Sequence, residues 1–244
     1  MRSSDQIKYL ESLGIPLWVP RAFSYTHVQA DPHPAAADAH ADEQHVQGTS
    51  SIRLSQPPGD IENMDWDELQ QTVLECIACG LHAGRTQAVF GTGNRSASLM
   101  VIGEAPGADE DAQGEPFVGR AGQLLDQMLQ AIDCPRASVY IANIVKCRPP
   151  DNRNPQSDEA LHCAPYLHRQ IALVQPRVIL AVVKVAAQNL LQSDLPVGKM
   201  RGSPYRYAPM DIPVIVTYHP AYLLRSPKEK AKSWQDLKLA RSFL

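Results

Sequence analysis

Four of the five cysteines have a spacing that could bind a metal. Cys76 and Cys79 form a C-x2-C corner, and Cys147 and Cys163 follow with 15 residues between them. Zinc ribbons usually contain two C-x2-C pairs, and the second pair here is not of that kind. A four-cysteine iron–sulfur cluster tolerates the wider spacing. The fifth cysteine, Cys134, stands alone beside a proline and is interpreted as a free thiol.

A second group of chemically capable residues lies in the glycine- and acid-rich segment 103–122. The segment opens with Gly-Glu-Ala-Pro-Gly, includes Glu104, Ala105 and Glu110, and continues through Phe117 into a predicted helix. Backbone N–H groups and carboxylates in such a loop can surround a small ligand. A surface loop with acidic turns explains the composition equally well. The segment is not a P-loop, because no Gly-Lys-Ser/Thr follows its glycines.

Asn143 and His219 lie at or just beyond the ends of two predicted strands. An asparagine side chain offers one acceptor and two donors, which suits the edge of a nucleobase. A histidine there can donate a hydrogen bond to negative charge that develops on a ligand. Each residue also has a plainer interpretation, since such an asparagine is usually structural and a histidine can cap a helix. A local basic patch is predicted near Asn143 from Lys146, Arg148 and Arg153.

The segments that would position these residues alternate between strands and helices. Strands are predicted over residues 99–103, 139–145, 178–182 and 214–218. Helices are predicted over residues 122–132, 157–174, 183–191 and 228–243, after an earlier helix that opens at Asp65 and leads to Cys76. This alternation predicts a three-layer α/β/α fold with a central parallel sheet of about four strands. Sites in such folds lie at the carboxyl ends of the strands.

The composition and charge indicate a folded domain without a general affinity for polyanions. Hydrophobic residues make up 44% of the chain and charged residues 20%, which is enough apolar material for a packed core. The net charge of −3 argues against non-specific nucleic-acid binding. Any contact with a polyanion must therefore come from a local basic patch. With no signal-peptide pattern and no apolar run of about 18 residues, the chain is expected to be cytoplasmic.

The first 60 residues differ from the rest. Residues 1–23 begin with a short amphipathic pattern and end in an apolar cluster at residues 17–20. Residues 24–60 are rich in Ala, Asp, His, Gln, Ser and Pro, and they are interpreted as a flexible linker. The sequence thus predicts a mostly disordered N-terminal extension ahead of one folded domain over residues 61–244.

Taken together, the motifs resemble the family-four uracil-DNA glycosylases, the iron–sulfur type found in bacteria and archaea. The similarity runs from about residue 76 to residue 243. It rests on four elements in the same order: the segment 103–122, the segment 143–150, His219 with Pro220, and the four-cysteine spacing. The resemblance implies a uracil-DNA glycosylase-like fold. It also implies an enzyme that flips uracil out of single- or double-stranded DNA and hydrolyses the N-glycosidic bond, leaving an abasic site.

The resemblance implies a role for each pocket residue. Phe117 matches the aromatic residue that stacks on the base, and Asn143 matches the asparagine that reads the uracil edge. Glu104 and the adjoining Ala105 match residues that contact the pyrimidine. His219 matches the residue that stabilises the departing uracil anion. Glu110 stands at the position proposed to orient or activate the attacking water.

Two further assignments follow from the resemblance. The four cysteines of the spaced set match the ligands of a structural [4Fe-4S] cluster: Cys76, Cys79, Cys147 and Cys163. Tyr222, Leu223 and Leu224 are candidates for a wedge that fills the vacated base stack. They could equally be the apolar start of the last helix.

Residues 9–21 resemble the N-terminal peptide of the psi subunit of the bacterial replicative clamp loader, which docks on the clamp-loader collar. The resemblance implies a contact with the clamp loader through residues 1–23. Folding of this segment back onto the parent domain explains its apolar residues equally well. A second hypothesis is therefore a replisome adaptor whose glycosylase-like domain is weakly active or inactive. The presence of the full set of pocket residues argues against an inactive site.

Overall fold

The computed structural model describes residues 60–182, 186, 190–191 and 195–244 of the 244-residue chain. The amphipathic segment 1–23 and the linker, apart from Asp60, lie outside the described residues. Most of the helix predicted over residues 183–191 lies outside them too. No helix of the described part is long and apolar enough to cross a membrane.

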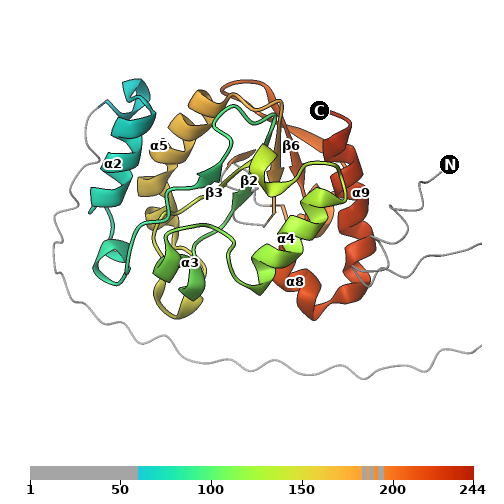
Figure 1. The fold of residues 1–244 in the computed structure, drawn as a ribbon, viewed down its shortest axis with the longest axis horizontal. Helices are drawn as coiled ribbons and strands as arrows, with labels where there is room; N and C mark the ends of the chain where they lie inside the picture. Colours follow the sequence, from blue (N-terminus) through green and yellow to red (C-terminus); the bar gives the residue numbers. More distant parts are fainter. Residues whose placement is uncertain (1–59, 183–185, 187–189, 192–194) are drawn as a thin grey trace, which may run out of the picture.

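A six-stranded sheet forms the centre of the molecule, in the order β1-β3-β2-β4-β6-β5 (Figure 1). The four inner strands run parallel to one another, whereas the two edge strands pair antiparallel with their neighbours. The strands are β1 (Thr92–Gly93), β2 (Leu99–Gly103), β3 (Tyr140–Asn143), β4 (Val178–Ala181), β5 (Pro204–Tyr207) and β6 (Ile212–Val216). The predicted parallel core of four strands is confirmed, and the edge strands turn it into a mixed sheet.

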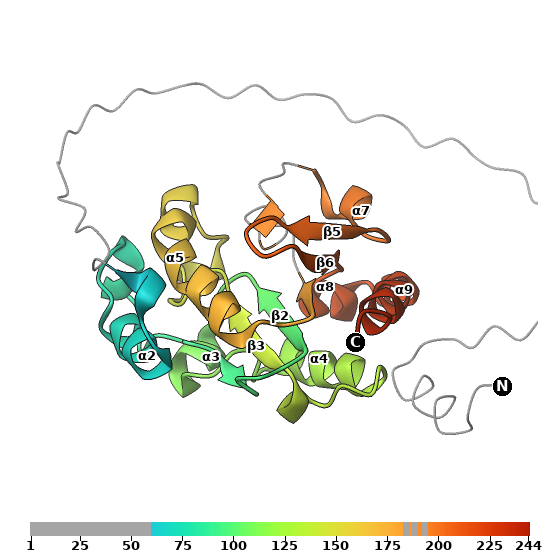
Figure 2. The same ribbon diagram turned by 90° about the horizontal axis from the view of Figure 1, so that it is seen from above.

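Helices cover both faces of the sheet, as the alternation of strands and helices predicts. Figure 1 shows α2 (Trp66–Glu75) and α5 (Ser157–Val174) on one side. The other side carries α4 (Arg120–Gln130), α8 (Pro220–Arg225) and α9 (Lys230–Arg241). Figure 2 places the short α7 (Val197–Met200) beside β5, far from α2. The three-layer α/β/α fold is therefore confirmed.

The inner strands are buried on both faces, so successive side chains enter two separate cores. In β2, Met100 and Ile102 pack with α2 and α5, whereas Leu99 and Val101 pack with α4 and α9. All five residues of β2 are buried. This two-sided burial explains why the inner strands read as continuous apolar runs rather than as alternating patterns.

The helix that leads to Cys76 begins with a complete capping box. The Asp65 carboxylate accepts hydrogen bonds from the backbone N–H groups of Asp67 and Glu68, and the Glu68 carboxylate accepts one from the Asp65 N–H. These contacts satisfy N–H groups that the first helical turn cannot pair internally. The cap fixes where α2 starts, and hence where it ends at Cys76.

The predicted element bounds agree with the structure to within a few residues. The bounds of β2 and α5 match, while the strand predicted over residues 139–145 ends at Asn143. The helix predicted over residues 228–243 begins with a 3₁₀ turn, η5 (Pro227–Glu229), before α9. The largest difference is the segment 103–122, which was expected to be a loop and contains the six-residue helix α3 (Ala108–Gln113).

Candidate active site and metal centre

The carboxyl ends of β2, β3 and β6 open into one pocket. Gly103 at the end of β2 pairs in parallel register with Asn143 at the end of β3, and His219 follows β6 by three residues. The surrounding residues enclose about 1030 Å³ of space free of protein atoms, part of it open to solvent. Six residues singled out from the sequence line this strand-end pocket: Glu104, Ala105, Glu110, Phe117, Asn143 and His219.

Asn143 presents a buried, unpartnered acceptor to the pocket. The residue is 2% exposed, and its Oδ1 has no hydrogen-bond partner among the described residues. A buried polar atom without a partner is costly, and it usually marks a place where a ligand or water supplies one. Gly103 permits this arrangement, because a Cβ at that position would lie 2.4 Å from Asn143 Oδ1 and 2.7 Å from the Phe117 ring.

Phe117 and His219 stand beside each other at the pocket. Their ring centroids lie 5.6 Å apart and the ring planes are tilted by 32°. Phe117 is buried and its backbone is left-handed, with φ 55°. Because the ring is apolar on both faces, it offers a surface on which a flat heterocycle can stack.

His219 is both a helix cap and a hydrogen-bond donor. It is the N-cap of α8, and its Nδ1 accepts a hydrogen bond from the Ala221 N–H at 3.1 Å. Because an acceptor nitrogen carries no proton, the proton of the neutral ring is assigned to Nε2. Burial, helped by the positive charge of Arg225, lowers the pKa of His219 to about 4. His219 is therefore neutral at physiological pH, with an Nε2–H available to a ligand.

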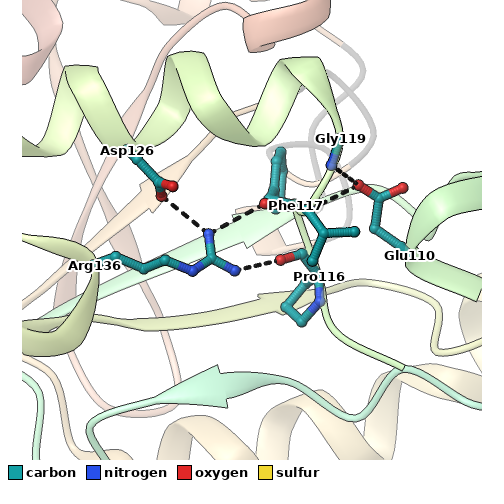
Figure 3. Close-up of polar contacts among 7 residues, drawn as sticks. Glu110, Pro116, Phe117, Gly119, Asp126 and Arg136 are labelled. Carbon is teal, nitrogen blue, oxygen red and sulfur yellow. Dashed lines mark hydrogen bonds and ion pairs between the residues drawn. The ribbon is translucent and has the colours of Figure 1, made fainter. Parts of the chain in front are cut away.

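The Glu110 carboxylate is held by three backbone N–H groups. Oε1 accepts from Val118 at 3.0 Å and Gly119 at 3.2 Å, and Oε2 accepts from Gly107 at 3.1 Å (Figure 3 draws the Oε1 contacts). These bonds join the start of α3 to the segment that carries Phe117. A carboxylate has about four lone-pair sites, so Glu110 keeps capacity for one further donor.

Glu104 lies directly after β2 and is partly buried at the pocket wall. Its Oε1 is buried and has no hydrogen-bond partner within the described residues. Burial raises the pKa of the Glu104 carboxyl group above its usual value. The group is therefore easier to protonate than an exposed glutamate, and a protonated carboxyl can donate a hydrogen bond.

The four cysteines of the spaced set surround a second, smaller cavity between α2 and α5. About 300 Å³ of space, part of it open to solvent, is free of protein atoms there. All four side chains line it: Cys76, Cys79, Cys147 and Cys163. Cys134 instead packs in the core on the opposite face of the sheet. Spacing alone thus separated the clustered cysteines from the isolated one.

Hydrogen-bond donors point at three of the four sulfurs. Arg85 Nη1 lies 3.0 Å from Cys147 Sγ, and Tyr166 Oη lies 3.3 Å from Cys76 Sγ. The backbone nitrogen of Lys146 lies 3.3 Å from Cys163 Sγ. Such donors stabilise negative charge on sulfur.

Burial raises the pKa of the Cys79 and Cys147 thiols and raises that of Cys163 to about 12. These three thiols would become thiolates only with a cation close to them. No three His, Cys, Asp or Glu side chains of the described residues converge closely enough to hold a single metal ion. The four thiols that line this cavity are the ligand type that holds iron–sulfur clusters.

The comparisons with known proteins decide the family. Residues 90–238 match the uracil DNA glycosylase superfamily. A Type-4 uracil-DNA glycosylase of Pyrobaculum aerophilum is 41% identical over 180 residues, which cover 71% of this chain and 92% of the relative. One of Archaeoglobus fulgidus is 40% identical over 178 residues, which cover 70% and 89%. The chain belongs to the Type-4 uracil-DNA glycosylase family.

In this member of the Type-4 family, a buried lysine joins the pocket to the cysteine cavity. Lys146 is 1% exposed, and its Nζ donates to Asn143 O at 3.0 Å and to Gln170 Oε1 at 2.5 Å. Burial lowers the pKa of Lys146 to about 8. The Lys146 backbone N–H also donates to Cys163 Sγ, so this one residue contacts both the cysteine cavity and the strand end that carries Asn143.

The predicted basic patch is present only in part. Lys146 is buried, and Arg153 donates to both oxygens of Glu159, at 2.9 and 2.6 Å, so its charge is compensated. Arg148 donates to Asn152 Oδ1 at 2.8 Å. Arg148 keeps its charge, because Asn152 is neutral, and Arg153 lines the strand-end pocket. Lys146 departs from the prediction because the sequence gives no sign of its buried partner Gln170. The basic residue that sequence reasoning left unassigned is Arg225, an exposed side chain that lines the strand-end pocket.

Proposed function

We propose that this member of the Type-4 family flips uracil out of DNA and hydrolyses its N-glycosidic bond. The products are free uracil and an abasic site whose C1′ carries the hydroxyl supplied by water. The observation that carries the proposal is the strand-end pocket. It brings together an aromatic face, an unpartnered amide acceptor and a neutral imidazole donor at the carboxyl edge of the sheet.

Base recognition is assigned to Phe117 and Asn143. The flipped uracil stacks on the Phe117 ring, which lies at the pocket wall. The Asn143 Oδ1, which lacks a partner in the described part of the chain, accepts from the uracil N3–H, and the amide N–H donates to O4. Glu104 and Ala105 line the same pocket and contact the pyrimidine. Cytosine presents an acceptor at N3 and a donor at N4, so it mismatches this pattern.

Bond cleavage is assigned to His219 and Glu110. As the C1′–N1 bond breaks, its electron pair passes to uracil, and the His219 Nε2–H donates to the O2 atom where negative charge develops. The sugar becomes cationic, and the Glu110 carboxylate stabilises that charge and orients the attacking water through its remaining lone-pair capacity. The water adds its hydroxyl to C1′, and the proton it releases is balanced by protonation of the departing uracil anion. Preorganised donors of this kind act most strongly once the bound base excludes water from the site.

A [4Fe-4S] cluster is assigned to the cysteine cavity, with Cys76, Cys79, Cys147 and Cys163 as its ligands. Support comes from the four thiols that line the cavity, from the hydrogen bonds directed at their sulfurs, and from the chain's resemblance to the iron–sulfur glycosylases. When bound, the cluster supplies covalent ties between the end of α2, the β3 end and α5. Its assigned role is structural.

The duplex wedge is assigned to Tyr222 and Leu224 of α8. Both are exposed, at 36% and 38%, whereas Leu223 between them is 1% exposed and packs in the core. An apolar side chain must project into the vacated stack to support a flipped base. Leu223 is therefore removed from the three candidates.

Uracil release tests the proposed function directly. The cluster-loaded chain is incubated with a labelled oligonucleotide that contains a single uracil, beside a thymine-containing control. We expect release from the first only, and a rate about 10- to 100-fold lower for Asn143→Ala, because the uracil N3–H and O4 lose their partners. Absence of release by the cluster-loaded wild-type chain would refute the proposal and favour the replisome adaptor.

The clamp-loader contact of residues 1–23 is a separate prediction. It rests on the short resemblance to the psi subunit and lies outside the described residues. We expect purified clamp loader to retain the full chain on a pull-down and to lose the variant that lacks residues 1–23. Equal retention of the truncated chain would contradict the adaptor role, while the uracil-release assay would remain unaffected.

A further inference from the structure

The backbone at Phe117 adopts a conformation that an aromatic residue seldom takes. Its φ of 55° lies in the left-handed region, where the Cβ of an L-residue crowds the following peptide group. Such a conformation persists only where neighbouring groups hold it. The contacts of residues 116–119 therefore decide where the Phe117 ring stands.

Arg136 binds the segment 116–119 from the side opposite Glu110. It belongs to the 3₁₀ turn η3 (Arg136–Ser138). Its Nη1 donates to Phe117 O at 3.2 Å, and its Nη2 donates to Pro116 O at 2.6 Å. Asp126 of α4 accepts from Nη1 at 3.0 Å and orients the guanidinium. Figure 3 shows Arg136 and Asp126 on one side of the segment and Glu110 on the other.

Two further contacts hold the segment 116–119 in place. Glu110 Oε1 accepts from the N–H groups of the two residues that follow Phe117. The Gly122 backbone packs so closely that a Cβ there would lie 1.8 Å from Phe117 O. Arg136 is the side chain that binds the carbonyls, and it does not line the strand-end pocket itself.

We propose that Arg136, oriented by Asp126, is a positioning residue that preorganises the Phe117 ring for stacking on the flipped base. The effect of this positioning on uracil release rests on the proposed function. Arg136 acts through the Phe117 and Pro116 carbonyls and touches no reacting atom. A planar guanidinium suits the task, because its two nitrogens reach adjacent carbonyls at once. Without it, the ring can leave the stacking position.

A double-mutant cycle separates this role from a general loss of stability. Arg136→Met, Phe117→Leu and the double variant are compared in single-turnover uracil release and in inhibition by free uracil. We expect Arg136→Met to weaken inhibition by uracil about tenfold, since base–aromatic stacking is of that size. In the Phe117→Leu background the same change should have little effect, because the ring it positions is gone.

Conservative variants and a matched arginine provide the controls. Asp126→Asn keeps the acceptor oxygen and should behave like wild type, whereas Asp126→Ala should resemble Arg136→Met. Arg136→Lys, which can reach one carbonyl but not both, should fall between them and serves if Arg136→Met fails to fold. Arg177 directly precedes β4, and its guanidinium also donates to a main-chain oxygen, that of Leu244. Arg177→Met removes this guanidinium. It should leave uracil inhibition unchanged.

A spectroscopic readout makes the test independent of catalysis. The chain has four phenylalanines, so 4-fluorophenylalanine labelling yields few ¹⁹F resonances, and the one lost in Phe117→Leu is assigned to the pocket ring. We expect Arg136→Met to shift or broaden that resonance, and Arg177→Met to leave it unchanged.

An unchanged Phe117 resonance, or equal effects of Arg136→Met with and without the Phe117 ring, would overturn the positioning role. An inactive wild-type chain would refute the proposed function instead. The ¹⁹F result would still decide whether Arg136 fixes the ring.

Discussion

Replacement of His219 by alanine is expected to lower the single-turnover rate of uracil release by about 10²–10³-fold, the usual effect of removing one donor to a developing oxyanion. His219→Gln should recover part of this loss, because its amide N–H can reach toward the same atom without carrying a charge. Both variants keep the apolar stacking surface of Phe117. The affinity for free uracil should therefore change less than the rate.

The pH dependence distinguishes a neutral donor from a cationic one. With a pKa of about 4, His219 stays neutral through the range where an exposed histidine would titrate. Protonation would occur at Nδ1, which already accepts the Ala221 N–H, and would break the α8 cap. The wild-type rate should therefore show no inflection near pH 6.5. An inflection there that His219→Gln abolishes would contradict the neutral-donor assignment.

The same shift predicts how stability depends on pH. The unfolded chain binds a proton to His219 below about pH 6.5, whereas the folded chain binds it only near pH 4. The unfolded state therefore holds more protons in this window, and stability falls as the pH is lowered from about 6.5 to about 4. The loss approaches about 3 kcal/mol, since one pKa unit is worth about 1.4 kcal/mol. About 2 kcal/mol of it should be lost between pH 7 and pH 5, and urea unfolding of wild type against His219→Gln at these two pH values measures that part.

The inner strands could be predicted from the sequence because burial on both faces produces a local signal. Apolar runs such as Leu99–Gly103 need no knowledge of the partner strand. The edge strands lack that signal, since β1 has two residues and β5 (Pro204–Tyr207) is mostly exposed or half-buried. The strand-end rule then placed Asn143 and His219 at one edge before any contact was known.

Side-chain partners could not be predicted, because they depend on residues distant in the sequence. Glu110 reads as one acid among several in the segment 103–122, yet its carboxylate binds N–H groups up to nine residues away. Lys146 reads as a surface cation and is buried against Gln170, 24 residues on. The capping role of His219 and its donor role were alternatives in the sequence. In the structure the cap leaves the proton on Nε2 and so permits the donor role.

Cysteine substitutions are expected to have the second large effect, on stability and on the iron content. Cys163→Ser should lose the broad absorbance near roughly 400 nm and most of the about four irons expected per chain. Ligands from α2, the β3 end and α5 meet at the cavity, so loss of the cluster should lower stability by several kcal/mol, on the order of 10 °C in Tm. Cys134→Ser is the matched control, because its thiol is also buried but lies on the other face of the sheet.

The kinetic consequence follows from the buried lysine between the two sites. Cys163 Sγ meets the Lys146 N–H, and Lys146 Nζ donates to the carbonyl of Asn143. If Cys163→Ser displaces this link, uracil affinity should fall even in protein that remains folded at low temperature. Cys134→Ser should leave absorbance, iron content and uracil affinity unchanged. Equal iron content in the Cys163→Ser and wild-type chains would contradict the assignment of the cavity to a cluster. Loss of iron without loss of uracil affinity would contradict only the link through Lys146.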